Sequence, residues 1–467
     1  MGLDPDFSLA YLTWFFDRLW GTTSHMAYMK SQIEQRYAEP LVSGERKTQV
    51  VVHVANSFEG YYTYDGIDVC GIRVANEIQE AINALNVDGN KVTKLSVAGY
   101  SLGGLISRYA LGLLFLRGLF DTIEPVSYTT FASPHVGVLT LGTGLASRLF
   151  NSLAPYMLAY TSQQLFLTDR VPVHKFKPLL YCMADPELPF YQALAKFKQC
   201  SLYANTINDH RTEFYTSALN SFIKNSSFLN NAGLPKYGPI VLDYTESVRL
   251  ALTREANAQK SLPDATAKRV GLGLLQFGSR IVNWAGLFVK LTVVMPIWAC
   301  CSITNSVFQS FSAWVRKRSF LKSDLFSTYH NDSLLKALND RLEQEPLTVS
   351  ETITEQAGVA FDSVIEAVNY KYETQHSGDS STNEVNHESD VSVVDQIDLA
   401  NPKDSLNLNK NQRFIIDNLN KLGWKKYPVH ISKAKHSHAA IICRYPSPLF
   451  DEGKVVIEHW LDEVLTI

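Results

Sequence analysis

Short apolar runs alternate with helix-like segments along residues 8–220. The runs rich in β-branched and aromatic side chains predict buried strands and span residues 8–16, 48–55, 92–99, 126–134 and 200–209. Between them, residues 71–85 place Val74, Ile78 and Ile82 on one helical stripe, and residues 102–116 form an apolar helix-like run. Strands that alternate with helices indicate an α/β protein with a mostly parallel sheet and helices on both of its faces.

The regular alternation ends near residue 235, and the rest of the chain divides by composition. We expect residues 1–235 to form the main part of the core. Residues 236–370 include an apolar segment and helix-like stretches, and we expect them to form a helical insertion. Residues 371–408 are polar and mostly acidic, with little to bury, which predicts a disordered linker. Apolar side chains return in residues 409–467, which we expect to complete the core.

The sequence Gly-Tyr-Ser-Leu-Gly at residues 99–103 joins a predicted strand to a predicted helix. The pattern G-x-S-x-G arises readily by chance, but this context favours a nucleophile elbow, a turn so tight that the positions two before and two after the serine are glycine. Ser101 is then the nucleophile. The Leu102 amide, at the start of the helix, is placed to stabilise an oxyanion. Gly104 lets the helix pack close to the strand.

A serine hydroxyl needs a base, and the base needs a carboxylate that orients it. In the chain order serine, acid, histidine, Asp209 follows a predicted strand and is the preferred acid. His438 opens an apolar run and is the preferred base. This order predicts an α/β-hydrolase fold with a large helical insertion between acid and histidine. The alternatives that stay open are Asp185 and Asp169 for the acid and His436 for the base, while His430 lies within an apparent strand.

Composition narrows the classes of protein. The chain of 467 residues has 43 lysines and arginines against 46 aspartates and glutamates, so no excess of positive charge points to nucleic acid. The six cysteines are scattered and form no C-x-x-C motif, so we expect neither a metal site nor a disulfide framework. This cysteine usage predicts that the protein resides in a reducing compartment. We see no signal peptide at the N-terminus. The predicted chemistry needs no cofactor.

Residues 282–304 form an apolar segment that contains one charge, Lys290, and a central proline, Pro296. Its length approaches the roughly 20 residues that span a bilayer. The proline favours a kink or hairpin, and basic residues follow and precede the segment, so both ends would lie on the cytosolic side. We expect this segment to dock onto a lipid droplet or membrane surface. A buried helical hairpin in a lid over the active site is the alternative.

Several longer stretches are similar to a known family; they are residues 63–78, 99–114, 131–137, 163–170, 205–212 and 436–444. They resemble the putative serine esterase family of lipase-like α/β-hydrolases, and within it the fungal branch that includes the lipid droplet phospholipase. The resemblance covers residues 10–220 and 411–445 and implies Ser101 as nucleophile, Asp209 as acid and His438 as base.

One departure from the family lies after the first predicted strand. The family has a His-Gly pair there, and the next amide is the second oxyanion donor, which the resemblance assigns to Leu19. Here Asp17 and Arg18 occupy the places of the pair. Arginine lacks the conformational freedom of glycine, so a weakened or silent enzyme is an alternative.

The resemblance implies hydrolysis of glycerophospholipids or acylglycerols at a lipid surface. The protein would then act on a lipid droplet or on the cytosolic face of the endoplasmic reticulum membrane. Two other classes stay open. One is a catalytically silent adaptor at a lipid surface, suggested by Asp17 and Arg18. The other is a cytosolic carboxylesterase or thioesterase that acts on a non-lipid substrate.

Overall fold

The computed structural model describes residues 9–16, 21–43, 46–86, 91–142, 145–156, 159–171, 177–221, 233–250, 295–321 and 406–466. These residues build a seven-stranded sheet in the order β2-β3-β1-β4-β5-β6-β7. Strand β2 pairs antiparallel with β3, and every other neighbouring pair is parallel. The strands are β1 Leu9–Phe16, β2 Leu41–Ser43, β3 Arg46–Val54, β4 Val92–Tyr100, β5 Glu124–Phe131, β6 Gln199–Asn205 and β7 Lys425–Val429.

The predicted alternation of strands and helices is confirmed in this part of the chain. The expected runs correspond to β1, β3, β4, β5 and β6. The remaining strands, β2 and β7, are short, and β7 ends at Val429, one residue before His430. Strand β7 follows β6 in the sheet although more than two hundred residues separate them in the chain, since Ser201 lies opposite Lys425.

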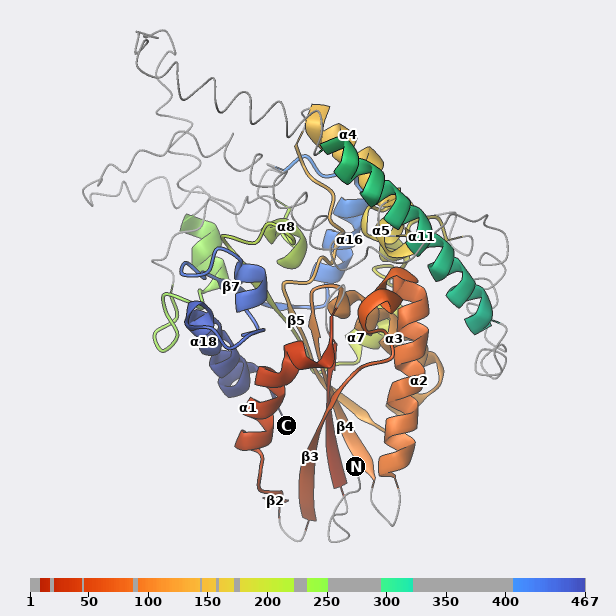
Figure 1. Cartoon of the computed structure of the whole chain (residues 1–467). Coiled ribbons are helices and arrows are strands. Elements are labelled where there is room, and N and C mark those ends of the chain that lie inside the picture. The colour runs from red at the N-terminus through yellow and green to blue at the C-terminus, as the bar shows by residue number, and fades with distance from the viewer. Residues whose placement is uncertain are drawn as a thin grey trace, which may run out of the picture.

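Helices cover both faces of the sheet (Figure 1). Helices α2 (Ile67–Leu85), α3 (Leu102–Leu116) and α7 (Pro189–Ala195) pack together on one face, and α1 (Ala27–Arg36) and α18 (Asp451–His459) cover the other. Neighbouring residues of β4 serve different cores, because Val97 packs with the α2–α3 side and Ala98 with the α1–α18 side. The two predicted helices are confirmed, and α2 begins four residues earlier than the apolar stripe indicated.

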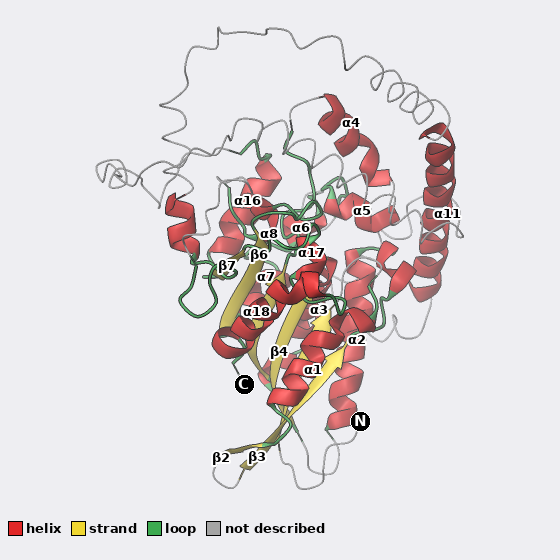
Figure 2. Ribbon diagram, turned by 60° about the vertical axis from the view of Figure 1, so that its left-hand side comes forward, coloured by secondary structure: helices red, strands yellow, loops and turns green. Residues whose placement is uncertain are grey.

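The shorter helices gather at the end of the sheet where the parallel strands finish (Figure 2). They carry several of the hydrogen-bonding residues described below. Their bounds are α4 Leu145–Leu153, α5 Ala159–Leu165, α6 Leu179–Cys182, α8 Phe214–Ser217, α16 Lys410–Asn420 and α17 Ser437–Ala440. Residues 240–242, which the composition assigned to the insertion, lie against β7, where Leu242 N donates to Pro428 O and His430 N to Ile240 O.

Helix α11 (Met295–Leu321) is the described part of the predicted insertion beyond residue 250. Residues 282–294 of the apolar segment lie outside the described residues, as do the predicted linker up to residue 405 and the helix-like stretch 331–344. Pro296 is the second residue of α11 as the structure describes it, so the predicted kink or hairpin within residues 282–304 stays a prediction. Among the described residues, no helix combines the length and apolar character needed to cross a membrane.

Candidate active site

Ser101 occupies a single-residue turn between β4 and α3. Its backbone has φ of 53° and ψ of −125°, a strained conformation for a residue with a side chain. Two hydrogen bonds hold the turn: Ser101 N donates to Phe131 O at 2.9 Å, and Gly104 N donates to Ser101 O at 3.1 Å. The strand–turn–helix geometry predicted for residues 99–103 is therefore present.

Glycines make this turn possible. A Cβ atom on Gly99 would lie 2.5 Å from Gly104 Cα and 3.1 Å from the carbonyl carbon of Gly103. A Cβ atom on Gly104 would lie 2.2 Å from Ser133 Oγ, just after β5. The crowding expected between Gly99 and Gly103 thus lies mainly between Gly99 and Gly104. Because Gly104 has no side chain, the first turn of α3 can approach both neighbouring strands.

The three preferred residues meet in one hydrogen-bonded chain. The His438 ring has Nε2 at 3.0 Å from Ser101 Oγ and Nδ1 at 3.0 Å from Asp209 Oδ2. Ser101 follows β4, Asp209 follows β6, and His438 lies in α17 after β7. All three therefore stand at the carboxyl ends of parallel strands, where the loops of an α/β sheet carry its chemistry.

Asp209 is buried and surrounded by donors. Its Oδ2 accepts from the Asn205 side chain at 2.8 Å, and its Oδ1 accepts from Thr212 N at 2.9 Å and Arg211 N at 3.1 Å. Burial raises the pKa of Asp209, but the charge and hydrogen bond of His438 and the other donors outweigh it, so that the pKa lies below its ordinary value. The carboxylate is thus ionised at neutral pH and oriented toward the imidazole.

His438 is held from its backbone as well as from its ring. Tyr100 donates its hydroxyl hydrogen to His438 O at 2.8 Å. The preceding residue, Ser437, donates from its side chain to Ile207 O at 2.7 Å and from its backbone to Asn208 O at 3.2 Å. Tyr100 and Ser437 could not be singled out from the sequence. Their adjacency to Ser101 and His438 becomes informative only once the pairing of these two segments is known.

The alternative acids and bases lie elsewhere. Asp169 accepts a hydrogen bond from Leu179 N at 2.8 Å, at the start of α6, and Asp185 accepts from Glu187 N at 3.0 Å in its own loop. His436 is the N-cap residue of α17. His430 has Nδ1 at 3.3 Å from Thr206 Oγ1. The described geometry therefore selects Asp209 and His438 as the partners of Ser101.

The structure describes one of the two predicted oxyanion donors, Leu102, and not the other, Leu19. Leu102 is the first residue of α3, so its amide is one of the N–H groups that a helix leaves without an intrahelical acceptor. Leu19 lies outside the described residues, together with Asp17 and Arg18. The last residue before them, Phe16, lies opposite Gly99 in the β1–β4 pair. Strand β1 therefore ends beside the serine turn.

Within the described part of the chain, no group of three or more histidine, cysteine or acidic side chains is arranged to hold a metal ion. Four cysteines in the described residues are buried free thiols: Cys70, Cys182, Cys200 and Cys443. Burial raises the pKa of the Cys200 thiol to about 12, so it is not a reactive thiolate.

Comparison with known proteins relates the N-terminal part of the chain to a family. Residues 12–221 match the family described as "Putative serine esterase (DUF676)". The putative lipase C4A8.10 of Schizosaccharomyces pombe is 31% identical over 186 residues, which are 39% of this chain and 23% of that protein. The putative lipase YDL109C of Saccharomyces cerevisiae is 31% identical over 209 residues, 44% of this chain and 30% of that protein. The matched stretch is thus less than a third of either relative.

Among solved structures, the phospholipase PlaB from Legionella pneumophila in complex with thio-NAD aligns with a TM-score of 0.28 and 12% identity over 44% of this chain and 41% of its own. A likeness of this size carries no argument about activity. The family match itself agrees with the strained serine turn on a parallel sheet described above. Residues 12–221 match the family described as putative serine esterase (DUF676), and the described residues have an α/β-hydrolase fold.

Proposed function

We propose that this protein hydrolyses carboxylic esters with Ser101 as nucleophile, His438 as base and Asp209 as the orienting acid. The observation that carries the proposal is the hydrogen-bonded chain from Ser101 Oγ through the His438 ring to Asp209 Oδ2. Ser101 stands on a strained turn at the start of a helix, as the nucleophile elbow of α/β-hydrolases does. The family match over residues 12–221 supports ester hydrolysis at this level.

The geometry supports a two-step reaction. In the first step His438 Nε2 takes the hydroxyl proton of Ser101 while Oγ attacks the carbonyl carbon of the ester. The Leu102 amide, and the Leu19 amide that the resemblance adds, would stabilise the negative oxygen of the tetrahedral intermediate. His438 then gives its proton to the departing alcohol. Water, activated by the same histidine, releases the acid from the serine ester.

Asp209 acts on the histidine and not on the substrate. Its ionised carboxylate accepts the Nδ1 hydrogen, so Nε2 of the neutral ring carries the lone pair that Ser101 needs. When His438 becomes positively charged, the same carboxylate stabilises it. The donors around Asp209 keep this carboxylate from turning away from the ring.

For the substrate we propose glycerophospholipids or acylglycerols. The names of the yeast relatives as putative lipases and the resemblance to lipid droplet phospholipases support this class. We further propose that residues 282–304 dock the protein onto a lipid droplet or the cytosolic face of the endoplasmic reticulum membrane. This rests on the sequence pattern of one apolar segment with basic residues at both ends. Tags near residues 270 and 325 would both be cleaved by protease from the cytosolic side if the segment dips into one leaflet.

A catalytically silent adaptor is the second candidate, because Asp17 and Arg18 replace the His-Gly pair of the family. A fluorophosphonate probe separates the two, since only an activated serine reacts with it. We expect the probe to label the wild type and not Ser101→Ala. The matched control is Ser152→Ala, an exposed serine on α4 that bonds only its own turn in the contacts described.

Lipid profiling then identifies the reaction. Purified protein and Ser101→Ala are incubated with mixed phospholipids and acylglycerols, and the released fatty acids and lyso-lipids are measured. We expect release by the wild type and by Ser152→Ala only. Labelling without release from lipids, but with cleavage of a soluble ester or thioester, would replace the lipid substrate by a non-lipid one. Absence of both labelling and release would leave the adaptor.

A further inference from the structure

The loop that carries the proposed base is hydrogen-bonded to the loop that carries the proposed acid. Ser437 precedes His438, and its backbone N–H donates to Asn208 O at 3.2 Å. Asn208 is the residue immediately before Asp209. The Ser437 hydroxyl donates to Ile207 O, one residue further back, at 2.7 Å. The backbone next to the acid is thus bonded directly to the backbone next to the base, so the positions of the two side chains are linked.

The side chain of Asn208 adds two contacts to the same loop. Its Nδ2 atom lies 3.3 Å from Ile431 O and 3.3 Å from Ala434 O. An amide nitrogen carries two hydrogens and can serve both carbonyls, whereas an oxygen in this place would face two acceptors. The surroundings therefore fix the orientation of the amide. One side chain thus holds the loop at two points ahead of His438.

The backbone of Asn208 restricts which residue fits this position. Its φ is 59°, in the left-handed region, which asparagine and aspartate enter more readily than other residues with a side chain. Glycine adopts this conformation freely but has no side chain to donate. Aspartate tolerates the backbone, but its carboxylate would oppose the two carbonyl oxygens. Of these three residue types, only asparagine combines the left-handed backbone with the donor.

A second anchor holds the middle of this loop. Glu452 of α18 is buried and accepts hydrogen bonds from Ser432 N at 2.9 Å and Lys433 N at 2.8 Å. The Ser432 hydroxyl donates to the other carboxylate oxygen at 2.9 Å. The loop therefore stays attached to the core when the Asn208 side chain is removed. A variant at this position tests the placement of the loop and not the folding of the protein.

We propose that Asn208 is a positioning residue for the proposed esterase: its side chain and carbonyl group hold the loop before His438 against Asp209, so that Nδ1 stays directed at the carboxylate. The proposal rests on the proposed function. It assigns Asn208 an action on the acid–base pair and not on the substrate. Loss of the two donated hydrogen bonds should let the imidazole move relative to Asp209 and therefore relative to Ser101.

The test compares Asn208→Gly and Asn208→Asp with Asn86→Gly. Asn208→Gly keeps the left-handed backbone and removes both donated hydrogen bonds, while Asn208→Asp turns a carboxylate oxygen toward the two carbonyls. Asn86 provides the matched control, because its side chain also holds a loop. It accepts from Val92 N at 2.7 Å, at the opposite end of β4 from Ser101.

Hydrolysis of a water-soluble ester, p-nitrophenyl butyrate, is measured per Ser101 titrated to completion with fluorophosphonate, so that unfolded molecules do not count. We expect kcat of Asn208→Gly to fall about tenfold with KM nearly unchanged, because a small misplacement of the reacting groups slows the chemical step. Asn208→Asp should fall further, and Asn86→Gly should match the wild type. An unchanged kcat in Asn208→Gly, or an equal fall in Asn86→Gly, overturns the proposal.

Proton NMR gives a readout that needs no substrate. The hydrogen on His438 Nδ1 gives a far-downfield signal while Asp209 holds it, and the signal broadens when this hydrogen exchanges with water. Its absence from His438→Gln identifies it. The signal should be sharp in the wild type and in Asn86→Gly, and broadened or lost in Asn208→Gly. An equally sharp signal in Asn208→Gly overturns the proposal.

The two readouts separate this proposal from the proposed function. A wild type that neither reacts with fluorophosphonate nor cleaves esters defeats the proposed function alone. The Nδ1 signal then still decides whether Asn208 holds His438 against Asp209. A wild type without this signal overturns the positioning role, because Asp209 would then not hold the imidazole in solution.

Discussion

Tyr100 donates its hydroxyl hydrogen to the carbonyl oxygen of His438, 2.8 Å away, and the two rings lie with centroids 5.1 Å apart. The residue before Ser101 thus holds the backbone of His438. Strand β4 and helix α17 are 338 positions apart in the chain at this contact. The hydrogen bond joins the segment that carries Ser101 directly to the segment that carries His438.

We expect Tyr100→Phe to lower both stability and activity. The change leaves a buried carbonyl without this donor, which costs about 1–3 kcal/mol of unfolding free energy. It also loosens His438, so kcat should fall more than KM changes. Urea denaturation and ester hydrolysis measure the two effects.

The matched control is Tyr109→Phe. The Tyr109 hydroxyl is buried on α3 and has no hydrogen-bond partner among the described residues, so its loss should be neutral or stabilising. If Tyr109→Phe impaired hydrolysis as much as Tyr100→Phe, the hydrogen bond to His438 would not be the cause.

Asp209→Asn should nearly abolish hydrolysis while the protein stays folded. Asparagine keeps the shape but offers no charge to stabilise the imidazolium, and its amide can favour the wrong tautomer of His438. In serine hydrolases this change costs kcat on the order of 10⁴-fold. Steady-state kinetics and fluorophosphonate labelling check the loss. Asp185→Asn is the comparison, because Asp185 bonds within its own loop; a similar loss there would reopen the choice of acid.

Stability should fall as pH drops from about 6.5 to about 4 because of His459. This histidine is buried against Tyr203, with Nδ1 at 2.7 Å from the hydroxyl oxygen, and burial lowers the pKa of His459 to about 4. In this window the unfolded chain binds a proton that the folded chain does not, so stability decreases toward acid by at most about 1.4 kcal/mol per pH unit.

Denaturant melts between pH 4 and 7 test this slope. His459→Gln, which cannot be protonated, should flatten it, whereas His436→Gln at an exposed position should leave it intact. A slope that survives in His459→Gln would assign the acid sensitivity to other groups.

The double change Asp17→His and Arg18→Gly should raise hydrolysis about tenfold. A restored oxyanion donor is worth roughly 2.7–4 kcal/mol, and imperfect geometry recovers only part of it. Rates on a soluble ester measure the effect, with Asp17→His alone as the control. A fall in rate would show that Asp17 and Arg18 have a local role that the family comparison does not capture.

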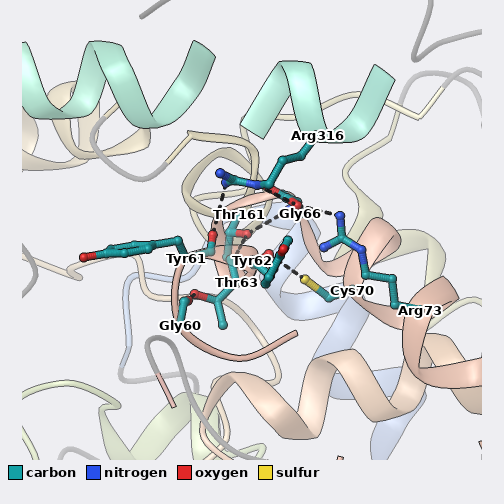
Figure 3. Close-up of polar contacts among 10 residues, drawn as sticks. Gly60, Tyr61, Tyr62, Thr63, Gly66, Cys70, Arg73, Thr161 and Arg316 are labelled. Carbon is teal, nitrogen blue, oxygen red and sulfur yellow. Dashed lines mark hydrogen bonds and ion pairs between the residues drawn. The ribbon is translucent and has the colours of Figure 1, made fainter. Parts of the chain in front are cut away.

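Much of the site was readable from the sequence because its signals are local. Gly99, Ser101 and Gly103 predict a tight turn between a strand and a helix, and the chain order limits the acid and the base. The supporting contacts could not be predicted, since each joins distant segments. The contacts of Tyr100 and Ser437 form only when β4 and α17 meet, and the contact of Arg316 with Asp65 (Figure 3) only when α11 lies against the core. Strand β7 is short and carries Pro428 and two lysines, so its apolar pattern is weak.

The distance between β6 and β7 in the chain has a consequence for how this architecture can vary. The last strand, β7, and the proposed catalytic histidine, His438, both lie beyond residue 406, and more than two hundred residues separate β6 from β7 in the chain. The entropic cost of closing such a connection grows only logarithmically, by about 0.6 kcal/mol for each doubling of length. Stretches of this connection that do not contact the core can therefore lengthen or shorten at little thermodynamic expense, while any failure of β7 to pair displaces His438 with it. The proposed hydrolysis therefore requires that β7, the strand most remote in the chain, has paired with β6.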